Sequence, residues 1–139
     1  MTNRGRRTAP LSVVRDALES QNERNLEHFR ELCAPTFKAH VGGANEDLSA
    51  FIMRLGNLLA AFPDAHVTVE DGFTEGTKVV ARYRLTGTHC ARFGGIPRTG
   101  ARVSIPGAFI ARVLNGRIAE AWNYLDLEDL RGQLGVQTI

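Results

Sequence analysis

Apolar residues recur at helical spacing in three segments of the first half of the chain. The first segment begins at Pro10, a favoured first residue of a helix, and its pattern weakens near Gln21. The second begins at Leu26, extends to Cys33 and is stopped by Pro35. The third carries a wide apolar face made of Leu48, Phe51, Ile52, Leu55, Leu58 and Leu59. A face of this width predicts a helix that lies across the core.

Capping and turn residues set the predicted start of the third helix. Asn45 is expected to cap it, with Glu46 and Asp47 in the first turn, where the helix dipole favours negative charge. Residues 37–41 before this helix form a short extended piece, which the Gly42-Gly43 pair interrupts. The helix is therefore expected to begin after a broken extended segment.

A period-two alternation of apolar and polar residues replaces the helical spacing after residue 64. Turn signals are Asp71-Gly72, Glu75-Gly76 and Asn115-Gly116, of which the last suits a type I′ hairpin turn. The predicted strands are 65–69, 79–88, 101–113 and 118–126. A helix over residues 127–134, ending at Gly135, follows them.

The alternation assigns the side chains of these strands to an inner and an outer face. In the last strand, Ala119, Ala121 and Asn123 are assigned inward, and Ile118 outward with Trp122. The inner face carries several small residues, namely Gly87, Gly107, Ala111, Ala119 and Ala121. Such residues favour a cavity, although larger side chains from the helices can fill the same space.

Helices followed by a long antiparallel meander predict an α+β fold. The expected architecture is a cone-like half-barrel, in which N-terminal helices pack on the concave face of a strongly curved, mostly antiparallel sheet. Residues 10–139 are expected to form this single domain, and residues 1–9 a disordered basic leader.

The composition argues against several classes of protein. The chain has 139 residues, 43% hydrophobic and 23% charged, which is ordinary for a globular domain. A net charge of +2 with dispersed basic residues argues against a nucleic-acid partner. No apolar run reaches the roughly 18 residues of a membrane span, and the first ten residues lack a secretory signal. Cys33 and Cys90 are isolated, which fits a reducing cytoplasm and gives no metal motif.

Several short motifs then occur in a recognisable order and spacing. They are Phe62-Pro63-Asp64, Gly87-Thr88-His89, Gly95-Ile96-Pro97-Arg98-Thr99-Gly100, Asn115-Gly116-Arg117-Ile118-Ala119-Glu120-Ala121-Trp122 and Gln133-Leu134-Gly135. Together they resemble the SnoaL-like polyketide cyclases of the nuclear-transport-factor-two-like superfamily. The resemblance implies a conical α+β barrel with a mainly apolar cavity, commonly dimeric. It also implies ring closure by an intramolecular aldol condensation without a metal or organic cofactor.

The same resemblance implies where an acid–base aspartate is expected, one residue after Trp122. This chain has Asn123 there, and the supporting glutamine and histidine of the preceding strand are replaced by Gly107 and Phe109. Asparagine cannot take a proton, but it can donate hydrogen bonds to an enolate oxygen. The chain therefore departs from the aldol pattern at all three positions.

Four residues are candidate catalytic groups, and each has a structural alternative. Asn123 either faces a ligand or is a polar group at the sheet rim. His40 is either a proton shuttle or a rim residue. Asp126 either reaches the pocket or caps the last helix, and Asp64 is either an acid–base group or a turn residue. Replacement of Asn123 or His40 by alanine is expected to lower turnover.

The candidate substrate-binding residues combine an apolar wall with one arginine that would reach a carbonyl or carboxylate. They are Arg54, Phe51, Leu55, Leu59, Tyr83, Gly107, Phe109 and Ala121. Core packing is the alternative role of the apolar members. Aromatic and aliphatic residues on the outer face, including Trp122 and Tyr124, suggest a homodimer through that face.

The leading hypothesis is a cofactor-free enzyme of secondary metabolism that cyclises or isomerises a hydrophobic, polyketide-like substrate. Hydroxylation and epoxide opening are alternatives within the same resemblance. A non-catalytic module that binds a hydrophobic ligand is the alternative from another class. A cavity of about 300–1,000 Å³ containing a carboxylate or histidine would favour an enzyme, and a filled interior would count against any ligand.

Overall fold

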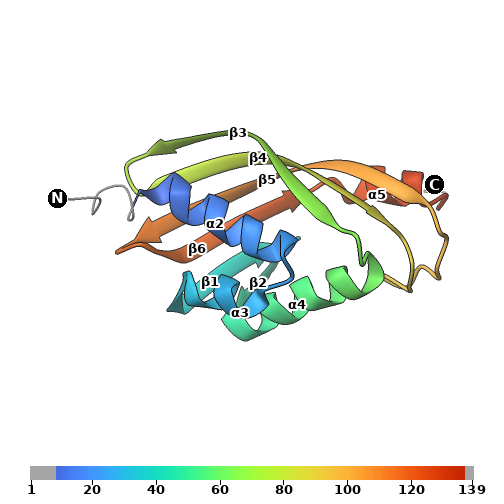
Figure 1. Cartoon of the computed structure of the whole chain (residues 1–139), viewed down its shortest axis with the longest axis horizontal. Helices are drawn as coiled ribbons and strands as arrows, with labels where there is room; N and C mark the ends of the chain where they lie inside the picture. The colour runs from blue at the N-terminus through green and yellow to red at the C-terminus, as the bar shows by residue number, and fades with distance from the viewer. Residues whose placement is uncertain (1–8, 137–139) are drawn as a thin grey trace.

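One six-stranded sheet and four helices make up the described part of the chain, residues 9–136 of this computed structural model (Figure 1). The helices are α2 (Pro10–Asn22), α3 (Leu26–Glu31), α4 (Leu48–Ala61) and α5 (Leu127–Gln133). The strands are β1 (Cys33–Val41), β2 (Ala44–Asp47), β3 (His66–Glu75), β4 (Lys78–Thr88), β5 (Arg102–Leu114) and β6 (Arg117–Leu125). The predicted leader falls, except for Ala9, outside the described residues.

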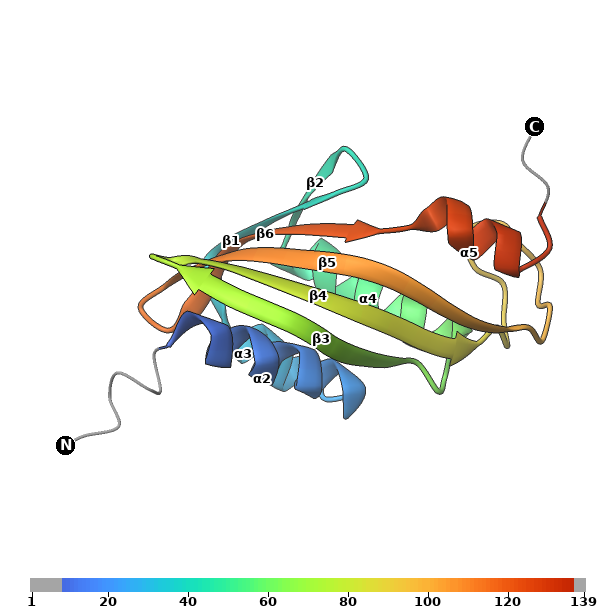
Figure 2. The same cartoon turned by 90° about the horizontal axis from the view of Figure 1, so that it is seen from above.

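The strands are ordered β2-β1-β6-β5-β4-β3, and only the β1–β6 pair is parallel. Helices α2, α3 and α4 cover one face of this sheet, and α5 closes the end where β5 begins (Figure 2). The predicted α+β half-barrel is therefore confirmed. None of the helices within residues 9–136 is long and apolar enough to cross a membrane.

The predicted inner face of the sheet is the core of the molecule. Val79, Ala81, Ile105 and Ala111 are at most 1% exposed, and they pack with apolar residues of α2 and α4. Burying this continuous apolar surface is the main favourable term in the folding of the chain. The alternation in β4 and β5 thus predicted correctly which side chains enter the core.

The start of α4 differs from the prediction. Asn45 and Glu46 belong to β2 and pair with β1, so their backbone cannot begin a helix. Asp47 is the N-cap instead, because its side chain accepts a hydrogen bond from the amide of Ala50 at 2.9 Å. The Gly42-Gly43 pair, with positive φ at both residues, forms the turn of the β1–β2 hairpin.

Cys33, predicted to be the last residue of the second helix, is instead the first residue of strand β1. Helix α3 ends at Glu31, and Cys33 pairs with Ile118 at the start of the parallel β1–β6 ladder. Pairing with a distant strand outweighs the local helical spacing here. Cys33 is buried, and this burial raises the pKa of its thiol to about 12, whereas Cys90 is exposed.

Two irregularities in the sheet also changed the predicted pattern. Asp71-Gly72 is not a turn, because β3 continues through a bulge between Val69 and Asp71 as far as Glu75. A second register shift, between Arg112 and Val113, places Ile118 opposite Val113 on the inner face. The outward assignment of Ile118 was therefore wrong, and its side chain is fully buried.

The remaining turn and capping predictions are confirmed. Asn115 and Gly116 both have positive φ, as a type I′ turn requires. Asp126 caps α5 by accepting a hydrogen bond from the amide of Asp129 at 2.9 Å, and Gly135 follows α5 with a φ of +81°. Gln133 of α5 bonds the amide and the carbonyl of Ser104, which fixes α5 against β5.

Candidate functional site

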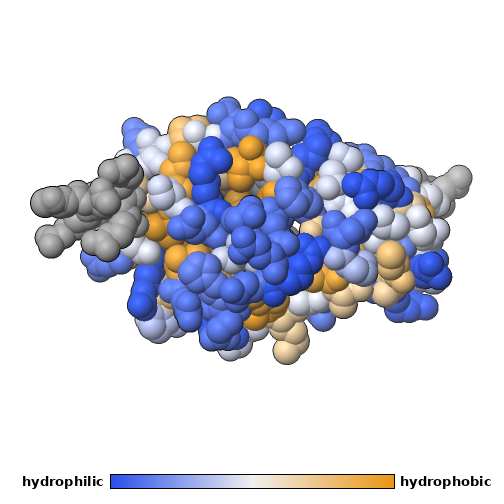
Figure 3. All heavy atoms as spheres, viewed as in Figure 1, coloured by the Kyte–Doolittle hydropathy of each residue, from blue (hydrophilic) through white to orange (hydrophobic). Residues whose placement is uncertain are grey.

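A cavity within the described residues lies between the helices and the inner face of the sheet. Its volume is about 50 Å³. The residues that line it are mainly apolar and come from all three covering helices and four strands: Leu18, Gln21, Phe29, Phe51, Leu55, Leu58, Val67, Tyr83, Leu85, Phe109, Asn123 and Leu125. The helical side of the molecule above it presents mainly hydrophilic side chains, with apolar atoms between them (Figure 3).

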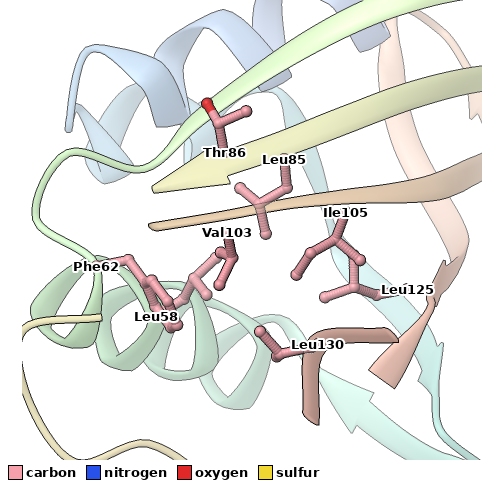
Figure 4. Close-up of a pocket in the computed structure, with 8 residues that line it drawn as sticks. All are labelled: Leu58, Phe62, Leu85, Thr86, Val103, Ile105, Leu125 and Leu130. Atoms are coloured by element: carbon pink, nitrogen blue, oxygen red, sulfur yellow. The ribbon is translucent and has the colours of Figure 1, made fainter. Parts of the chain in front are cut away.

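A smaller cavity of about 10 Å³ adjoins the larger one, toward α5 (Figure 4). Its lining is almost wholly apolar and consists of Leu58, Phe62, Leu85, Thr86, Val103, Ile105, Leu125 and Leu130. Both cavities are lined by Leu58, Leu85 and Leu125. These three leucine side chains therefore separate the two spaces.

Neither cavity reaches the roughly 300–1,000 Å³ of a typical ligand site, and neither lining holds a carboxylate or histidine, so the criterion that would favour an enzyme is not met by the cavities as they stand. Large side chains fill most of the space that small inner residues were expected to leave. A Cβ atom on Gly87 would lie 3.3 Å from the Cβ of Phe62, and one on Gly107 would lie 2.4 Å from Cζ of Tyr83. The larger cavity, as it stands, holds a few water molecules at most.

Tyr83 and Asn123 form a polar pair on the sheet side of the larger cavity. The hydroxyl of Tyr83 donates a hydrogen bond to Oδ1 of Asn123 at 2.8 Å. Burial raises the pKa of Tyr83 to about 12, and the bond to Asn123 opposes this shift. The phenol is therefore protonated near neutral pH. No protein group within the described residues accepts a hydrogen bond from Nδ2 of Asn123, so both of its protons are available to a ligand.

The predicted substrate-binding residues divide into two groups. Phe51, Leu55, Tyr83 and Phe109 line the larger cavity, and Asn123 joins them. The other four are absent from the lining of both cavities. Gly107 lies beneath the ring of Tyr83, Ala121 is fully buried, and Leu59 is partly buried on α4. Arg54 donates from Nε to both carboxylate oxygens of Glu46, at 2.9 and 3.0 Å.

His40 lies on the outer face of the sheet, away from both cavities. Its ring stacks on Trp122, with centroids 5.2 Å apart, and Nε2 lies 2.7 Å from Oε2 of Glu120. The hydrogen bonds from His40 and from Arg112 lower the pKa of Glu120. The neighbouring Ala39 faces the core instead, so the alternation of β1 places His40 outward. This position does not fit a proton shuttle in the cavity.

The two candidate carboxylates also lie outside both linings. Asp126 caps α5. Asp64 accepts hydrogen bonds from the amide and the hydroxyl of Thr88, at 2.7 and 2.8 Å, and from Arg102 at 3.1 Å. The bonds from Thr88 are the main cause of a lowered pKa at Asp64. The alternative structural roles of both residues thus match their contacts.

Gln21 is a cavity residue that the sequence reading missed. It is 6% exposed and lines the larger cavity, and its carboxamide has no hydrogen-bond partner within the described residues. A signal was present, because Gln21 follows Ala17 and Leu18 at helical spacing and so continues the apolar stripe of α2. A polar residue in such a stripe is a candidate for ligand contact.

The lining of the larger cavity combines three polar side chains with an apolar wall. Its two amides can donate hydrogen bonds to an oxygen atom, whereas the phenol proton of Tyr83 is already donated to Asn123. No carboxylate or imidazole is among its described residues. No cluster of three or more His, Cys, Asp or Glu side chains that could hold a metal ion occurs within residues 9–136. The arrangement suits stabilisation of a carbonyl or enolate oxygen.

These features define a class of protein, a small α+β half-barrel with an apolar, amide-lined cavity. The family model of SnoaL-like polyketide cyclases matches residues 12–134, and the chain belongs to that family. Comparison with curated proteins finds no similar sequence.

Solved structures agree with this assignment. IdmH from Streptomyces antibioticus, described as a proposed polyketide cyclase, is 31% identical over 92% of this chain and 99% of its own, with a TM-score of 0.84. AclR from Streptomyces galilaeus, described as a proposed hydroxylase, is 23% identical over 91% of this chain and 95% of its own, with a TM-score of 0.84. A SnoaL-like protein from Jannaschia sp. CCS1 is 22% identical over 99% and 98%, with a TM-score of 0.85, which shows the fold.

Proposed function

We propose that this protein binds a hydrophobic, polyketide-like carbonyl compound in the larger cavity and promotes its isomerisation or cyclisation. The observation that carries the proposal is the Tyr83–Asn123 pair, in which Tyr83 holds the amide of Asn123 in the cavity wall and the amide protons have no acceptor among the described residues. Hydrogen-bond donors held in a low-dielectric site stabilise the negative charge that develops on an enolate oxygen.

The proposed chemistry relies on a substrate that forms its own enol. The described lining has no carboxylate to remove a proton from carbon, unlike the aldol pattern of the family resemblance. An enol can close a ring or return to its keto form when its hydroxyl proton moves to the new alkoxide or to carbon. Asn123, oriented by Tyr83, would lower the barrier by stabilising the charge on oxygen during that transfer.

Binding of a polyketide-sized molecule requires the cavity to enlarge. Leu58, Leu85 and Leu125 separate the two existing spaces, so rotation of these side chains would join them. Leu58 and Leu125 are only partly buried, whereas Leu85 belongs to the core, so the first two are the freer to change rotamer. Ligand entry would therefore begin with movement of these three residues and of α4, which carries Leu58.

Binding without turnover is the second candidate function. It is favoured by the absence of carboxylate and imidazole groups from the described lining. The enzyme and the binding module both require a ligand in the cavity. Only the enzyme requires that the bound ligand react faster than it does in buffer.

The test uses benzoylacetone, an enolisable 1,3-diketone whose keto and enol forms differ in ultraviolet absorbance. We expect the wild-type protein to bind it and to accelerate keto–enol interconversion above the buffer rate. Asn123→Ala should lower this acceleration at least about tenfold, because loss of one oxyanion donor typically costs more than that. Asn57→Ala removes an exposed amide of α4 and should leave the rate unchanged.

The outcomes separate the hypotheses. Binding with no acceleration would support the non-catalytic module and reject the enzyme. Neither binding nor acceleration would reject the proposed function as a whole, provided that thermal melting shows a folded protein.

A further inference from the structure

We infer that Gln21 is a second ligand-positioning residue, and that the ligand carries two oxygen acceptors, one held by Asn123 and the other by Gln21. This inference rests on the proposed function of the same cavity. Asn123 reaches the cavity from β6, and Gln21 reaches it from the last turn of α2 on the opposite wall. A ligand between the two walls would be held at two points.

The carboxamide of Gln21 has no protein partner among the described residues, and its nitrogen and oxygen atoms are not themselves fully buried. The residue is 6% exposed, it lines the larger cavity, and no other described residue bonds its side chain. Buried polar groups in proteins are nearly always hydrogen-bonded, since an unpaired one loses its hydration without compensation. An unpaired amide in a cavity wall is therefore expected to have a partner that enters the cavity.

The position of Gln21 is fixed by its neighbour in the sequence. The side chain of Asn22 donates to the carbonyl of Val67 at 2.9 Å and accepts from the amide of Val67 at 2.7 Å. These two bonds attach the end of α2 to β3. Gln21 therefore projects from an anchored helix end, which fixes where its side chain begins.

The rest of the lining limits the chemistry of the ligand. Phe29, Phe51 and Phe109 surround the polar groups and favour a flat or aromatic apolar body. Each of the two amides offers two N–H donors, and each has one carbonyl oxygen. The matching ligand is an apolar compound with at least two carbonyl or enol oxygens, rather than a monoketone or a hydrocarbon.

A pair of probes tests the two-point contact. Benzoylacetone has two carbonyl groups, and 4-phenyl-2-butanone has a similar skeleton with only one. Gln21→Leu should weaken the binding of benzoylacetone about tenfold, the factor that one lost hydrogen bond of ordinary strength gives, and should change the binding of 4-phenyl-2-butanone less than twofold. Asn57→Ala serves as the control for both probes, and binding is followed by calorimetry.

Thermal melting completes the experiment. Leucine continues the apolar stripe of α2, so Gln21→Leu should melt at the same temperature as the wild type or higher. Gln21→Glu, which retains oxygen atoms but adds a charge, should lose benzoylacetone binding as Gln21→Leu does.

Equal effects of Gln21→Leu on the two probes, or no effect on either, would overturn the role of Gln21 while leaving the proposed function intact. No binding of either probe to the wild type would instead remove the proposed function itself.

Discussion

At the scale of single residues, Tyr83 and Gly107 depend on each other. The ring of Tyr83 crosses β5 at Gly107, where a Cβ atom would lie 2.4 Å from Cζ and 2.6 Å from the hydroxyl oxygen. The glycine therefore lets the hydroxyl reach Asn123. The family resemblance implied a glutamine at position 107, and in this chain Tyr83 of the adjacent strand occupies that space.

Gly107→Ala is expected to lower the free energy of unfolding by about 1–3 kcal/mol, because a methyl group in this filled site forces Tyr83 to move. Urea denaturation measures the change. The control is Gly132→Ala in α5, where a Cβ atom meets nothing within 4 Å, and this variant should be neutral or more stable.

A double variant makes the test specific. If Tyr83→Val is combined with Gly107→Ala, the two losses should be clearly less than additive, since the clash partner is gone. Additive losses would mean that contact with Tyr83 is not the reason why position 107 requires glycine.

At the scale of elements, the segment between β4 and β5 is held against the end of α4. His89 is fully buried, stacks on Phe62 and has Nδ1 2.9 Å from the hydroxyl of Thr99. Cys90 donates its amide proton to the carbonyl of Ala61. Asp64 completes the attachment by joining the turn after α4 to Thr88. The end of the half-barrel at α4 is therefore closed by contacts between residues that are far apart in the sequence, which short motifs could not predict.

Asp64→Asn is expected to destabilise the protein at neutral pH by less than about 1 kcal/mol, since the carboxylate is 49% exposed. The pKa of Asp64 is lowered in the folded protein from its ordinary value of 3.8. Its stabilising effect is therefore present above that value and is lost as the pH falls through the lower folded pKa. Denaturation between pH 7 and pH 2 should show the difference between wild type and variant shrinking at the acid end.

The control for this measurement is Asp16→Asn, which changes an exposed carboxylate that has no hydrogen-bond partner within the described residues. A difference between wild type and Asp64→Asn that stays constant down to the lowest pH would show that the negative charge of Asp64 contributes nothing.

At the scale of the whole molecule, the outer face of the sheet has no helical cover comparable to that of the inner face (Figure 2). Strand register aligns an apolar row across it, made of Phe73, Val80, Ile110 and Trp122. Phe73 is 60% exposed, and the nearby Tyr124 is 58% exposed. Charges of both signs, including Arg112 and Glu120, flank this row. We propose that a second copy of the chain covers it, because an apolar row flanked by charges of both signs can pair with its own copy in a twofold dimer.

Trp122→Ala should weaken self-association at least about tenfold, since a large aromatic side chain near the centre of an interface contributes strongly to affinity. Equilibrium sedimentation measures the effect. The control is Met53→Ala, which changes an apolar residue, 67% exposed, on the helical side. A wild-type protein that remains monomeric at high concentration would refute the dimer.

The sequence by itself determined the fold class, the strands β4, β5 and β6 and most of the core. Period-two spacing in β4 and β5 depends on burial of one face only, so it can be read from residue order. The Asn115-Gly116 turn and the Asp126 cap could also be predicted, because each depends on contacts between residues that are near in sequence. The cavity residues Phe51, Leu55, Tyr83, Phe109 and Asn123 were also predicted, since they lie on the faces that must point inward.

Only the tertiary structure decided which of these residues form a site. Two bulges changed the register of β3 and β6. Pairing of β1 with β6 made Cys33 a strand residue and placed His40 on the outer face. The filling of the space above Gly107 by Tyr83, and the unpaired amide of Gln21, depend on side chains from different elements. Local propensity and periodicity carry no information on such distant contacts, because their energy arises only when the sheet and helices have packed.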